Sequence, residues 1–431
     1  MSPGTLHHNS ENAVLPQRVL LVENSRTFTS MLREAIEQRV ELAVTVVSTL
    51  AEAARVLDEE DGWFLVLTGL VLVDGDRDKV VEFFLSRKLP TVVVSGVYDE
   101  DLRQRVLQQQ IIDYVLKNAP GSIEYLAWLV QRLERNRRIA ALVVDDSLSA
   151  RTYAGALLSM DGYRVVLAAD GAGLEAIEHD PDIRLTIVDQ EMPGMDGVEF
   201  TRRLRAIRSR DKVAVIGISG NSDSSLIPRF LKNGANDFLR KPFSREEFFC
   251  RVSQNVDQLE LVGTLQDLAT RDFLTGLPNR RYFLEQSQRV IPKLLLEDQT
   301  VTAAMVDIDH FKHINDTWGH EAGDQALRAV AASVSGHARP QDLVARFGGE
   351  EFCLLVPGLD AANATTYFET LRERISALRV RVGEETLSMT VSIGVCIASE
   401  SDQSLHYLLN EADKHLYLAK AGGRNQVRLA G

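Results

Sequence analysis

Short apolar runs alternate with helical segments over the first half of the chain, and this pattern occurs twice. In its second occurrence, β-branched runs predict strands near residues 140–144, 164–168, 184–188, 213–218 and 236–240. Apolar strands separated by helices are typical of βαβ units, which build a parallel, doubly wound sheet. In such sheets the functional groups lie at the carboxyl ends of the strands.

Three landmarks relate the two occurrences to each other. Residues 18–25 resemble 140–147, 91–95 resemble 213–219, and 113–117 resemble 237–241, all at nearly the same offset. Internal similarity of this kind indicates two copies of one domain. We expect the copies to span 16–138 and 139–256, after an N-terminal stretch, 1–15, that we predict to be disordered.

A long helical segment follows the second copy. No proline occurs from Ser244 to about Arg271, and apolar residues recur at spacings of three and four, at Phe248, Val252, Val256, Leu259, Val262, Leu265 and Leu268. This stripe predicts that the last helix of the second copy continues into a stalk over 257–271. We expect the stalk to pair with its copy in a homodimer, the alternative being a surface helix packed on its own domain.

A different α/β domain is predicted over 272–431. Its strands are expected near 301–307, 351–356 and 389–397, and the turn at 346–352 lies between apolar runs as in a hairpin.

Composition narrows the functional classes. The length of 431 residues favours two to four domains, and 45% hydrophobic with 25% charged residues is ordinary for a globular protein. The formal charge of −13 offers no basic field for nucleic acid. Cys250, Cys353 and Cys396 form neither a disulfide framework nor a zinc site. Without a signal peptide or a membrane-spanning run, we expect a cytoplasmic protein.

Carboxylates gather at the strand ends of the second copy. Asp145 and Asp146 end the first strand and Asp189 ends the third. Such groups repel one another unless a hard cation such as Mg²⁺ lies between them. Lys241 supplies a positive charge and Ser219 a hydroxyl donor. A single aspartate here would more often only cap a helix, but the whole set favours a site.

This constellation resembles the receiver domain of response regulators, over residues 139–256. The resemblance implies that Asp189 accepts a phosphoryl group from a histidine kinase. It also implies that Mg²⁺ is held by three groups, namely Asp145, Asp146 and the Glu191 backbone carbonyl. Lys241 and Ser219 would bind the phosphoryl oxygens, and Phe238 occupies the position of the switch aromatic.

The first copy departs from the receiver pattern. Glu23 and Asn24 replace the acidic pair, and we expect the acceptor position at Leu67 or Thr68, neither of which is a carboxylate. Other receiver positions remain, at Ser95, Tyr114 and Lys117. We interpret this copy as a degenerate receiver kept for packing or dimerisation, and phosphorylation of Thr68 is the alternative.

The C-terminal domain combines carboxylates with a glycine turn. Asp307 ends an apolar strand, and Glu350 and Glu351 follow Gly348 and Gly349, which let backbone approach a ligand closely. Such carboxylates can bind Mg²⁺, which suits nucleoside triphosphate chemistry. Further groups are available for a nucleotide: an amide and a carboxylate for a guanine edge, Asn315 and Asp324, and cations for phosphates, Lys420 and Arg424.

These motifs, opening with residues 272–280, resemble the GGDEF family of diguanylate cyclases in its GGEEF variant. The resemblance implies a ferredoxin-like core related to nucleotidyl cyclases and polymerase palms, and condensation of two GTP into cyclic di-GMP and two pyrophosphates. It implies Mg²⁺, with Mn²⁺ as its substitute, held by Asp307, the Ile308 carbonyl and Glu350.

The resemblance also assigns the remaining groups. Asn315 and Asp324 would hold guanine, on a substrate-binding segment that includes Phe311 and His320. Three cations would contact phosphates, namely Lys312, Lys420 and Arg424. Glu350 and Glu351 both remain candidates for the base that accepts the 3′-hydroxyl proton.

Condensation of two GTP requires two facing half-sites, so activity would depend on a homodimer. The alternative is a non-catalytic adaptor that binds GTP or cyclic di-GMP. Arg339 and Asp342, just before the glycine turn, resemble the inhibitory product site of the family, and a surface salt bridge is the other interpretation.

Overall fold

The computed structural model describes residues 17–97, 99–107, 111–221, 223, 225–297, 299–383, 385–398 and 404–430. The chain forms two compact units, Met1–Glu260 and Leu261–Gly431. The disorder predicted for residues 1–15 concerns a stretch outside the described residues.

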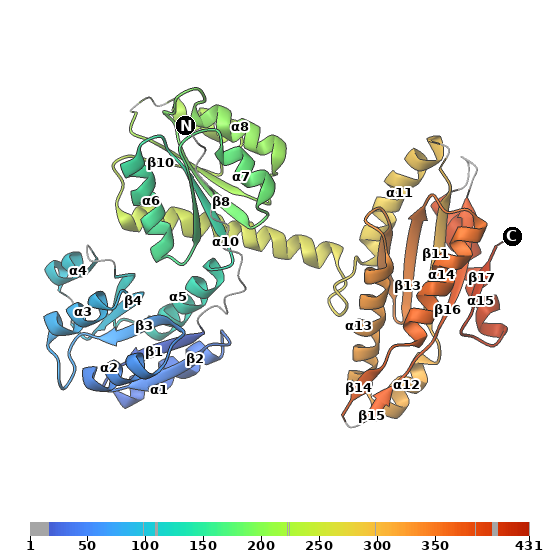
Figure 1. Cartoon of the computed structure of the whole chain (residues 1–431), viewed down its shortest axis with the longest axis horizontal. Coiled ribbons are helices and arrows are strands. Elements are labelled where there is room, and N and C mark those ends of the chain that lie inside the picture. The colour runs from blue at the N-terminus through green and yellow to red at the C-terminus, as the bar shows by residue number, and fades with distance from the viewer. Residues whose placement is uncertain are drawn as a thin grey trace. The chain divides into compact units, whose positions relative to one another are not determined.

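The first half of unit 1 is a five-stranded parallel sheet with strand order β2-β1-β3-β4-β5 (Figure 1). Its elements are β1 (Arg18–Val22), α1 (Arg26–Glu37), β2 (Ala43–Val47), α2 (Leu50–Glu59), β3 (Trp63–Gly69), α3 (Arg77–Ser86), β4 (Thr91–Ser95), α4 (Glu100–Leu107), β5 (Asp113–Leu116) and α5 (Ser122–Asn136).

The second half of unit 1 repeats this topology. Its sheet has the equivalent order β10-β9-β8-β6-β7, again all parallel. The elements are β6 (Ala140–Val144), α6 (Leu148–Met160), β7 (Arg164–Ala168), α7 (Gly173–His179), β8 (Ile183–Asp189), α8 (Gly197–Ile207), β9 (Ala214–Ser219), α9 (Leu226–Lys232), β10 (Asp237–Arg240) and α10 (Arg245–Thr270). Two flavodoxin-like, doubly wound folds are thereby confirmed.

Each sheet of unit 1 has helices on both faces. In the second half, α6 and the start of α10 pack on one face, and α7, α8 and α9 pack on the other. Because both faces are covered, the central strand β8 is almost entirely buried, which agrees with the apolar residues Ile183, Leu185, Ile187 and Val188 before Asp189.

Helix α10 is one unbroken element with two different halves. Phe248, Val252 and Val256 are buried in the core of the second domain. Beyond Glu260 the helix exposes Leu261, Leu265 and Leu268, each by more than half. The apolar stripe therefore continues past the domain that it packs on.

Unit 2 has a five-stranded sheet in the order β12-β13-β11-β16-β17, antiparallel except for the last pair. Its elements are α11 (Arg280–Leu296), β11 (Val301–Ile308), α12 (Phe311–Trp318), α13 (His320–His337), β12 (Leu343–Gly348), β13 (Glu351–Pro357), α14 (Ala361–Ser376), β14 (Val380–Val382), β15 (Glu385–Leu387), β16 (Val391–Ala398), α15 (Leu405–Ala421) and β17 (Val427–Leu429).

Helices α12, α13 and α14 pack on one face of this sheet, and α11 and α15 pack on the other. The predicted hairpin forms between β12 and β13. The short hairpin β14–β15 and the edge strand β17 were not predicted. This α+β arrangement confirms the fold class, and it places the end of the fully buried central strand β11 beside the glycine turn.

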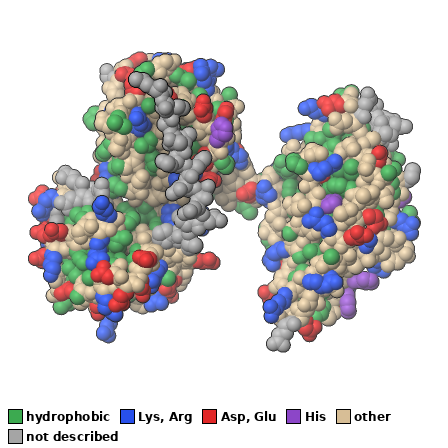
Figure 2. All heavy atoms as spheres, in the orientation of Figure 1, with side chains coloured by type: hydrophobic (Ala, Val, Ile, Leu, Met, Phe, Trp, Pro, Cys, Tyr) green, Lys and Arg blue, Asp and Glu red, His purple; other side chains and the backbone are tan. Residues whose placement is uncertain are grey.

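Surface charge agrees with the composition. Figure 2 shows Lys and Arg side chains interspersed with Asp and Glu over the visible face of both units. Within the described ranges, no helix combines the length and the apolar character that crossing a bilayer requires.

Candidate functional sites

Three carboxylates meet at the carboxyl edge of the second sheet. Asp145 and Asp146 follow β6, and Asp189 ends β8. One oxygen of each lies within 4.8 Å of the others, with Asp145 and Asp189 buried and Asp146 exposed. Oxygen ligands at this spacing, open to solvent on one side, suit a hard divalent cation that keeps some of its water.

Lys241, directly after β10, reaches into this cluster. Its Nζ lies 2.9 Å from Asp145 Oδ2 and 2.6 Å from Asp189 Oδ1. The backbone N–H of Glu191 donates to Asp189 Oδ2 at 2.7 Å. Burial raises the pKa of the Asp189 carboxyl, while Lys241 opposes this shift. The carboxylate is thus held in place by two donors, with its charge only partly compensated.

The other predicted receiver residues lie on neighbouring strands. Ser219 ends β9, and its buried hydroxyl accepts a hydrogen bond from the Asn221 N–H at 2.9 Å. Phe238, in β10, is buried and packs on Phe230 with ring centroids 5.3 Å apart. The structure therefore places Phe238 in the core, beside α9.

The register of the first sheet corrects the expected acceptor position. Val22 pairs with Thr68, whereas its counterpart Val144 pairs with Val188. The residue that corresponds to Asp189 is therefore Gly69, and the prediction of Leu67 or Thr68 is wrong. The first copy has two more residues than the second between these strand ends, so a constant offset between the copies misplaces this position.

At the first sheet's edge, Glu23 fills the space of an acceptor side chain. A Cβ atom on Gly69 would overlap Glu23 Oε2. Glu23 is almost fully buried, forms an ion pair with Lys117 and accepts a hydrogen bond from the Ser25 N–H at 3.0 Å. Thr68 is also buried, and its hydroxyl donates to the Gly69 carbonyl. This edge is a closed ion pair instead of an open acidic cluster.

In unit 2, Asp307 lies near the end of β11 and directly opposite Glu351 in the antiparallel register. Lys420 Nζ, from the last turn of α15, lies 2.7 Å from Asp307 Oδ2. Burial raises the pKa of Asp307 to about 6, and the charges of Glu350 and Glu351 add to this against the opposing Lys420. A further cation near these carboxylates would favour the ionised form.

The glycine turn is held in place by Arg346 and Asp272, whose contact the sequence did not predict. Gly349 has a φ of +46°, a conformation that glycine adopts readily. The Arg346 guanidinium donates to the Gly349 carbonyl at 2.8 Å and to Asp272 Oδ1 at 3.0 Å. Asp272 also accepts from Thr275. The segment that opens the domain is thereby fastened to the turn that carries Glu350.

Helices α12 and α13 bring the predicted guanine-binding residues together. A Cβ atom on Gly323 would overlap the Asn315 side-chain oxygen, so Asn315 rests directly on α13 beside Asp324. Phe311, the first residue of α12, is buried, whereas Lys312 and His320 are exposed. The bend between the two helices is at Gly319, with a φ of +83°.

The second carboxylate of the β11 end is structural. Buried Asp309 accepts hydrogen bonds from the Thr390 hydroxyl at 2.7 Å, the Ser392 hydroxyl at 2.6 Å and the Asn425 N–H at 3.0 Å. It thereby anchors the turn after α15, where Arg424 has a φ of +64° and an exposed side chain.

Arg339 and Asp342 contact each other. Arg339 Nη2 lies 3.1 Å from Asp342 Oδ1, and the Arg339 N–H donates to Asp342 Oδ2 at 2.8 Å. The Tyr367 hydroxyl donates to the same Oδ2 at 2.9 Å. The Asp342 side chain has no exposed surface, whereas 35% of the Arg339 side chain is exposed. Of the pair, only the arginine is open to a ligand in this conformation.

Comparison with known proteins agrees with this geometry. The family model described as diguanylate cyclase, GGDEF domain, matches residues 269–426, and the response regulator receiver domain matches 141–253. The response regulator PleD of Caulobacter vibrioides is 31% identical over 378 residues, which cover 79% of this chain and 83% of PleD. The diguanylate cyclase DgcP of Pseudomonas aeruginosa is 38% identical over 162 residues, covering 38% of this chain and 24% of DgcP.

Among solved structures, a two-component system response regulator/GGDEF domain protein matches with 39% identity and a TM-score of 0.52. The match covers 57% of this chain and 99% of that one. The chain therefore belongs to the response regulators with a GGDEF domain. It is an enzyme of the diguanylate cyclase class.

Proposed function

We propose that this chain condenses two GTP molecules into cyclic di-GMP and two pyrophosphates, under the control of phosphorylation at Asp189. The observation that carries the proposal is the meeting of Asp307, Lys420 and the Glu350 turn at the end of β11. A buried carboxylate, a lysine and a glycine turn whose backbone can approach a ligand closely suit the binding of a triphosphate.

In unit 2, the buried Asp307 lies next to the turn that carries Glu350. Burial beside two other acids raises the pKa of Asp307 to about 6, and a bound cation would lower this pKa again. We propose that Asp307, the Ile308 carbonyl and Glu350 hold Mg²⁺, which when bound would offset charge on the phosphates.

The chain's own residues orient the nucleotide. Asn315 and Asp324 would hydrogen-bond the guanine edge, and cations around the turn would contact the phosphates, namely Lys312, Lys420 and Arg424. Glu350 or Glu351 would accept the proton of the attacking 3′-hydroxyl. In-line attack needs a second half-site, so we propose a homodimer whose stalks pair through the exposed leucines of α10.

Control would act through the acidic edge of the second domain. We propose that Asp189 accepts a phosphoryl group from a histidine kinase, with Mg²⁺ held by Asp145, Asp146 and the Glu191 carbonyl. Lys241 and Ser219 would bind the phosphoryl oxygens. Phe238, which lies in the core, would be the switch aromatic that responds to phosphorylation. Because GTP and such phosphodonors occur in the cytoplasm, we propose that location for the reaction.

The first domain would act as a degenerate receiver. Its site has no carboxylate at Gly69, and Glu23 already neutralises Lys117. Domain boundaries at 16–138, 139–256, 257–271 and 272–431 agree with this division of roles, and we retain them as proposals.

We propose product inhibition at Arg339 and Asp342 as a secondary feature. Guanine would have to displace the Tyr367 hydroxyl or the Arg339 guanidinium from Asp342, which is fully enclosed. Arg339→Ala should therefore abolish inhibition by added cyclic di-GMP while leaving initial rates unchanged. An unchanged inhibition constant in this variant would assign the pair to a structural salt bridge.

Incubation of the full chain with Mg²⁺ and GTP, followed by chromatography, tests the main proposal. The wild type should form cyclic di-GMP, and Glu350→Gln should form none, because a metal ligand and a proton acceptor are removed. The exposed Glu385→Gln is the matched control and should keep wild-type turnover. GTP binding without product in the wild type would instead support the adaptor alternative.

Insertions in the exposed half of α10 test how control reaches the cyclase. Two residues added at Gly263 would rotate the C-terminal part of the helix by about 200°, and seven residues by about 700°, which nearly restores the face. We expect the first insertion to uncouple activity from Asp189 phosphorylation and the second to preserve coupling. Equal responses would mean that the stalk is a passive tether.

A further inference from the structure

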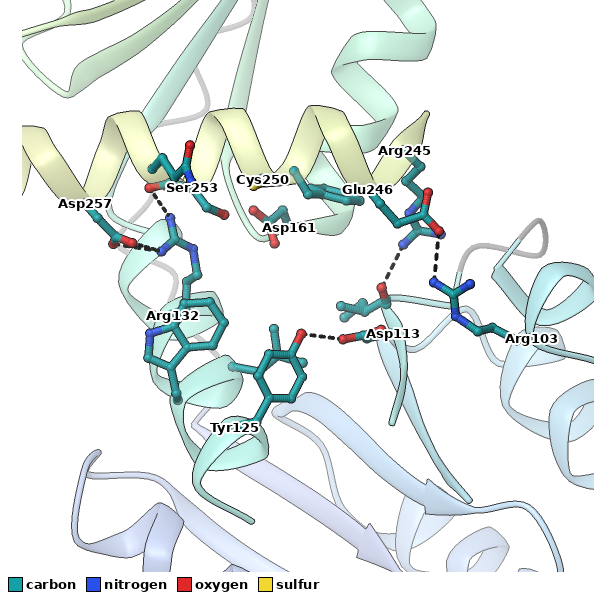
Figure 3. Close-up of a pocket in the computed structure, with 15 residues that line it drawn as sticks. Arg103, Asp113, Tyr125, Arg132, Asp161, Arg245, Glu246, Cys250, Ser253 and Asp257 are labelled. Carbon is teal, nitrogen blue, oxygen red and sulfur yellow. Dashed lines mark hydrogen bonds and ion pairs between the residues drawn. The ribbon is translucent and has the colours of Figure 1, made fainter. Parts of the chain in front are cut away.

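A cavity of about 400 Å³ lies between the first domain and α10 (Figure 3). One wall comes from α5 and β5, and the other from α10 and the turn between α6 and β7. Apolar and aromatic side chains line much of the first wall, namely Ile112, Tyr125, Trp128 and Leu129, and Phe249 faces them from α10. Cavities of this volume and character accommodate small organic molecules.

A buried carboxylate faces the centre of this cavity. Asp161, in the turn after α6, is only 7% exposed, and Figure 3 shows it between α10 and the side chains of α5. Within the described part of the chain, its side-chain oxygens accept one hydrogen bond, a long one of 3.4 Å from Asn136 Nδ2. Burial raises the pKa of Asp161 to about 7, although Arg132 and Arg245 oppose it. This carboxylate therefore has room for a better donor.

The arginines around the cavity are directed to other acceptors. Arg132 donates twice to Asp257, at 2.7 and 2.8 Å, and to the Ser253 carbonyl. Arg245 donates to the carbonyls of Ile111 and Ile112.

The charged groups at the edge of the cavity are paired in the same way. Arg103 pairs with Glu246, and the Tyr125 hydroxyl donates to Asp113 at 2.6 Å. Because these groups already have partners, Asp161 is the acceptor that the cavity offers to a ligand.

We propose that this cavity binds a small organic cation, an amine with a ring-sized apolar body, whose ammonium group pairs with Asp161. A charge-assisted hydrogen bond would replace the long contact from Asn136. The ring would lie against the aromatic side chains of Tyr125 and Phe249. A ligand that contacts both walls stabilises the association of the two domains. The proposal does not depend on the cyclase reaction.

Isothermal titration calorimetry of the full chain with three probes tests the charge preference. Phenethylamine, 2-phenylethanol and 3-phenylpropionate share a ring and differ in charge. We expect phenethylamine to bind once per chain, and about 10-fold more tightly than the other two, the difference expected for one hydrogen bond to a charged group. Equal affinities, tighter binding of the anion, or no binding of the amine would overturn the proposal.

Variants locate the binding site. Asp161→Asn should weaken phenethylamine binding about 10-fold, whereas the exposed Asp182→Asn should not change it. Gln254→Trp keeps Asp161 but places an indole ring at an exposed lining position of α10. Because the ring would occupy space that the ligand needs, this variant should also weaken binding. Unchanged affinity in both cavity variants would move the site elsewhere.

Cysteine chemistry gives an independent readout. Cys250 lines the cavity and is exposed, while Cys353 and Cys396 are buried. Bound phenethylamine should slow alkylation of Cys250 by iodoacetamide in the wild type, and it should do so less in Asp161→Asn. An alkylation rate that the amine does not change would contradict binding at this cavity.

Discussion

The two domains of unit 1 have the same strand order, yet the carboxyl edges of their sheets differ in chemistry. In the second domain, Asp145 and Asp189 share one lysine, and Asp146 remains exposed. In the first domain, the buried Glu23 pairs with the partly buried Lys117 over a glycine. One edge holds excess negative charge, which a bound cation could offset during phosphoryl transfer. At the other edge, the acid and the lysine neutralise each other.

This difference shows that one fold can carry different chemistry at the same sheet edge. The longer side chain of Glu23 reaches the space that an acceptor side chain would need, so the lysine keeps a partner and the sheet edge stays packed. The excess charge of the second domain has the opposite character, because it destabilises the free protein unless a ligand binds.

The largest expected effect concerns phosphorylation itself. Asp189→Asn should abolish labelling by acetyl phosphate, measured by intact-protein mass spectrometry, because the nucleophilic carboxylate is lost. Thr68→Ala should label like the wild type, since the Thr68 hydroxyl is buried and hydrogen-bonded. Residual labelling of one group per chain in Asp189→Asn would show that the first domain is not degenerate.

The second prediction compares how much one acid at each sheet edge contributes to the stability of the chain, Glu23 in the first domain and Asp145 in the second. Glu23→Ala leaves Lys117 partly buried without its counter-charge, which should reduce the free energy of unfolding by about 3 kcal/mol. Asp145→Ala removes one of three clustered acids and leaves Lys241 with Asp189, so we expect a change below about 1 kcal/mol. Urea unfolding measures both. Equal losses would mean that the two edges do not differ in this respect.

A third prediction concerns the acceptor position. Gly69→Ala should cost about 2 kcal/mol, because the new methyl group overlaps Glu23. In a Glu23→Ala background the same change should cost much less, since the obstructing carboxylate is gone. Asp189→Ala in the second domain is the matched control, and it should be tolerated. Additive costs of Gly69→Ala and Glu23→Ala would argue against this overlap.

The smallest expected effect is the stabilisation of the chain by Mg²⁺. Mg²⁺ at about five times its Kd should stabilise the chain by about 1 kcal/mol through the acidic edge of the second domain. The increase in melting temperature caused by Mg²⁺ should be smaller in Asp146→Asn, and this decrease measures the contribution of the site. Glu23→Gln is the control and should leave that contribution unchanged. Because the pKa of Asp189 is raised, protons should compete with Mg²⁺ as the pH falls, and the stabilisation should shrink.

Much of this architecture follows from the sequence because the buried strands are rich in apolar residues. The strands that carry Asp189 and Asp307 form as predicted, and the topology brings these residues to the carboxyl ends of their strands. Gly69 was missed because an apolar run such as β3 does not reveal its own register, which depends on pairing with β1.

Other features depend on contacts between distant segments. The brace from Arg346 to Asp272 joins residues 74 positions apart, and no local pattern marks either as a partner. The enclosure of Asp342 by Tyr367 and the position of Asp161 beside α10 also arise only when separate elements pack. The sequence therefore predicts candidate polar groups at strand ends, whereas the contacts that position them appear only in the folded structure.

The glycine at position 69 has an evolutionary consequence. An aspartate introduced there alone would meet the carboxylate of Glu23, and shortening Glu23 alone would draw its charge away from Lys117. Each single change toward an aspartate at this position is therefore expected to be harmful until the other has occurred. Such sign epistasis would make an acceptor at position 69 difficult to reach by single substitutions.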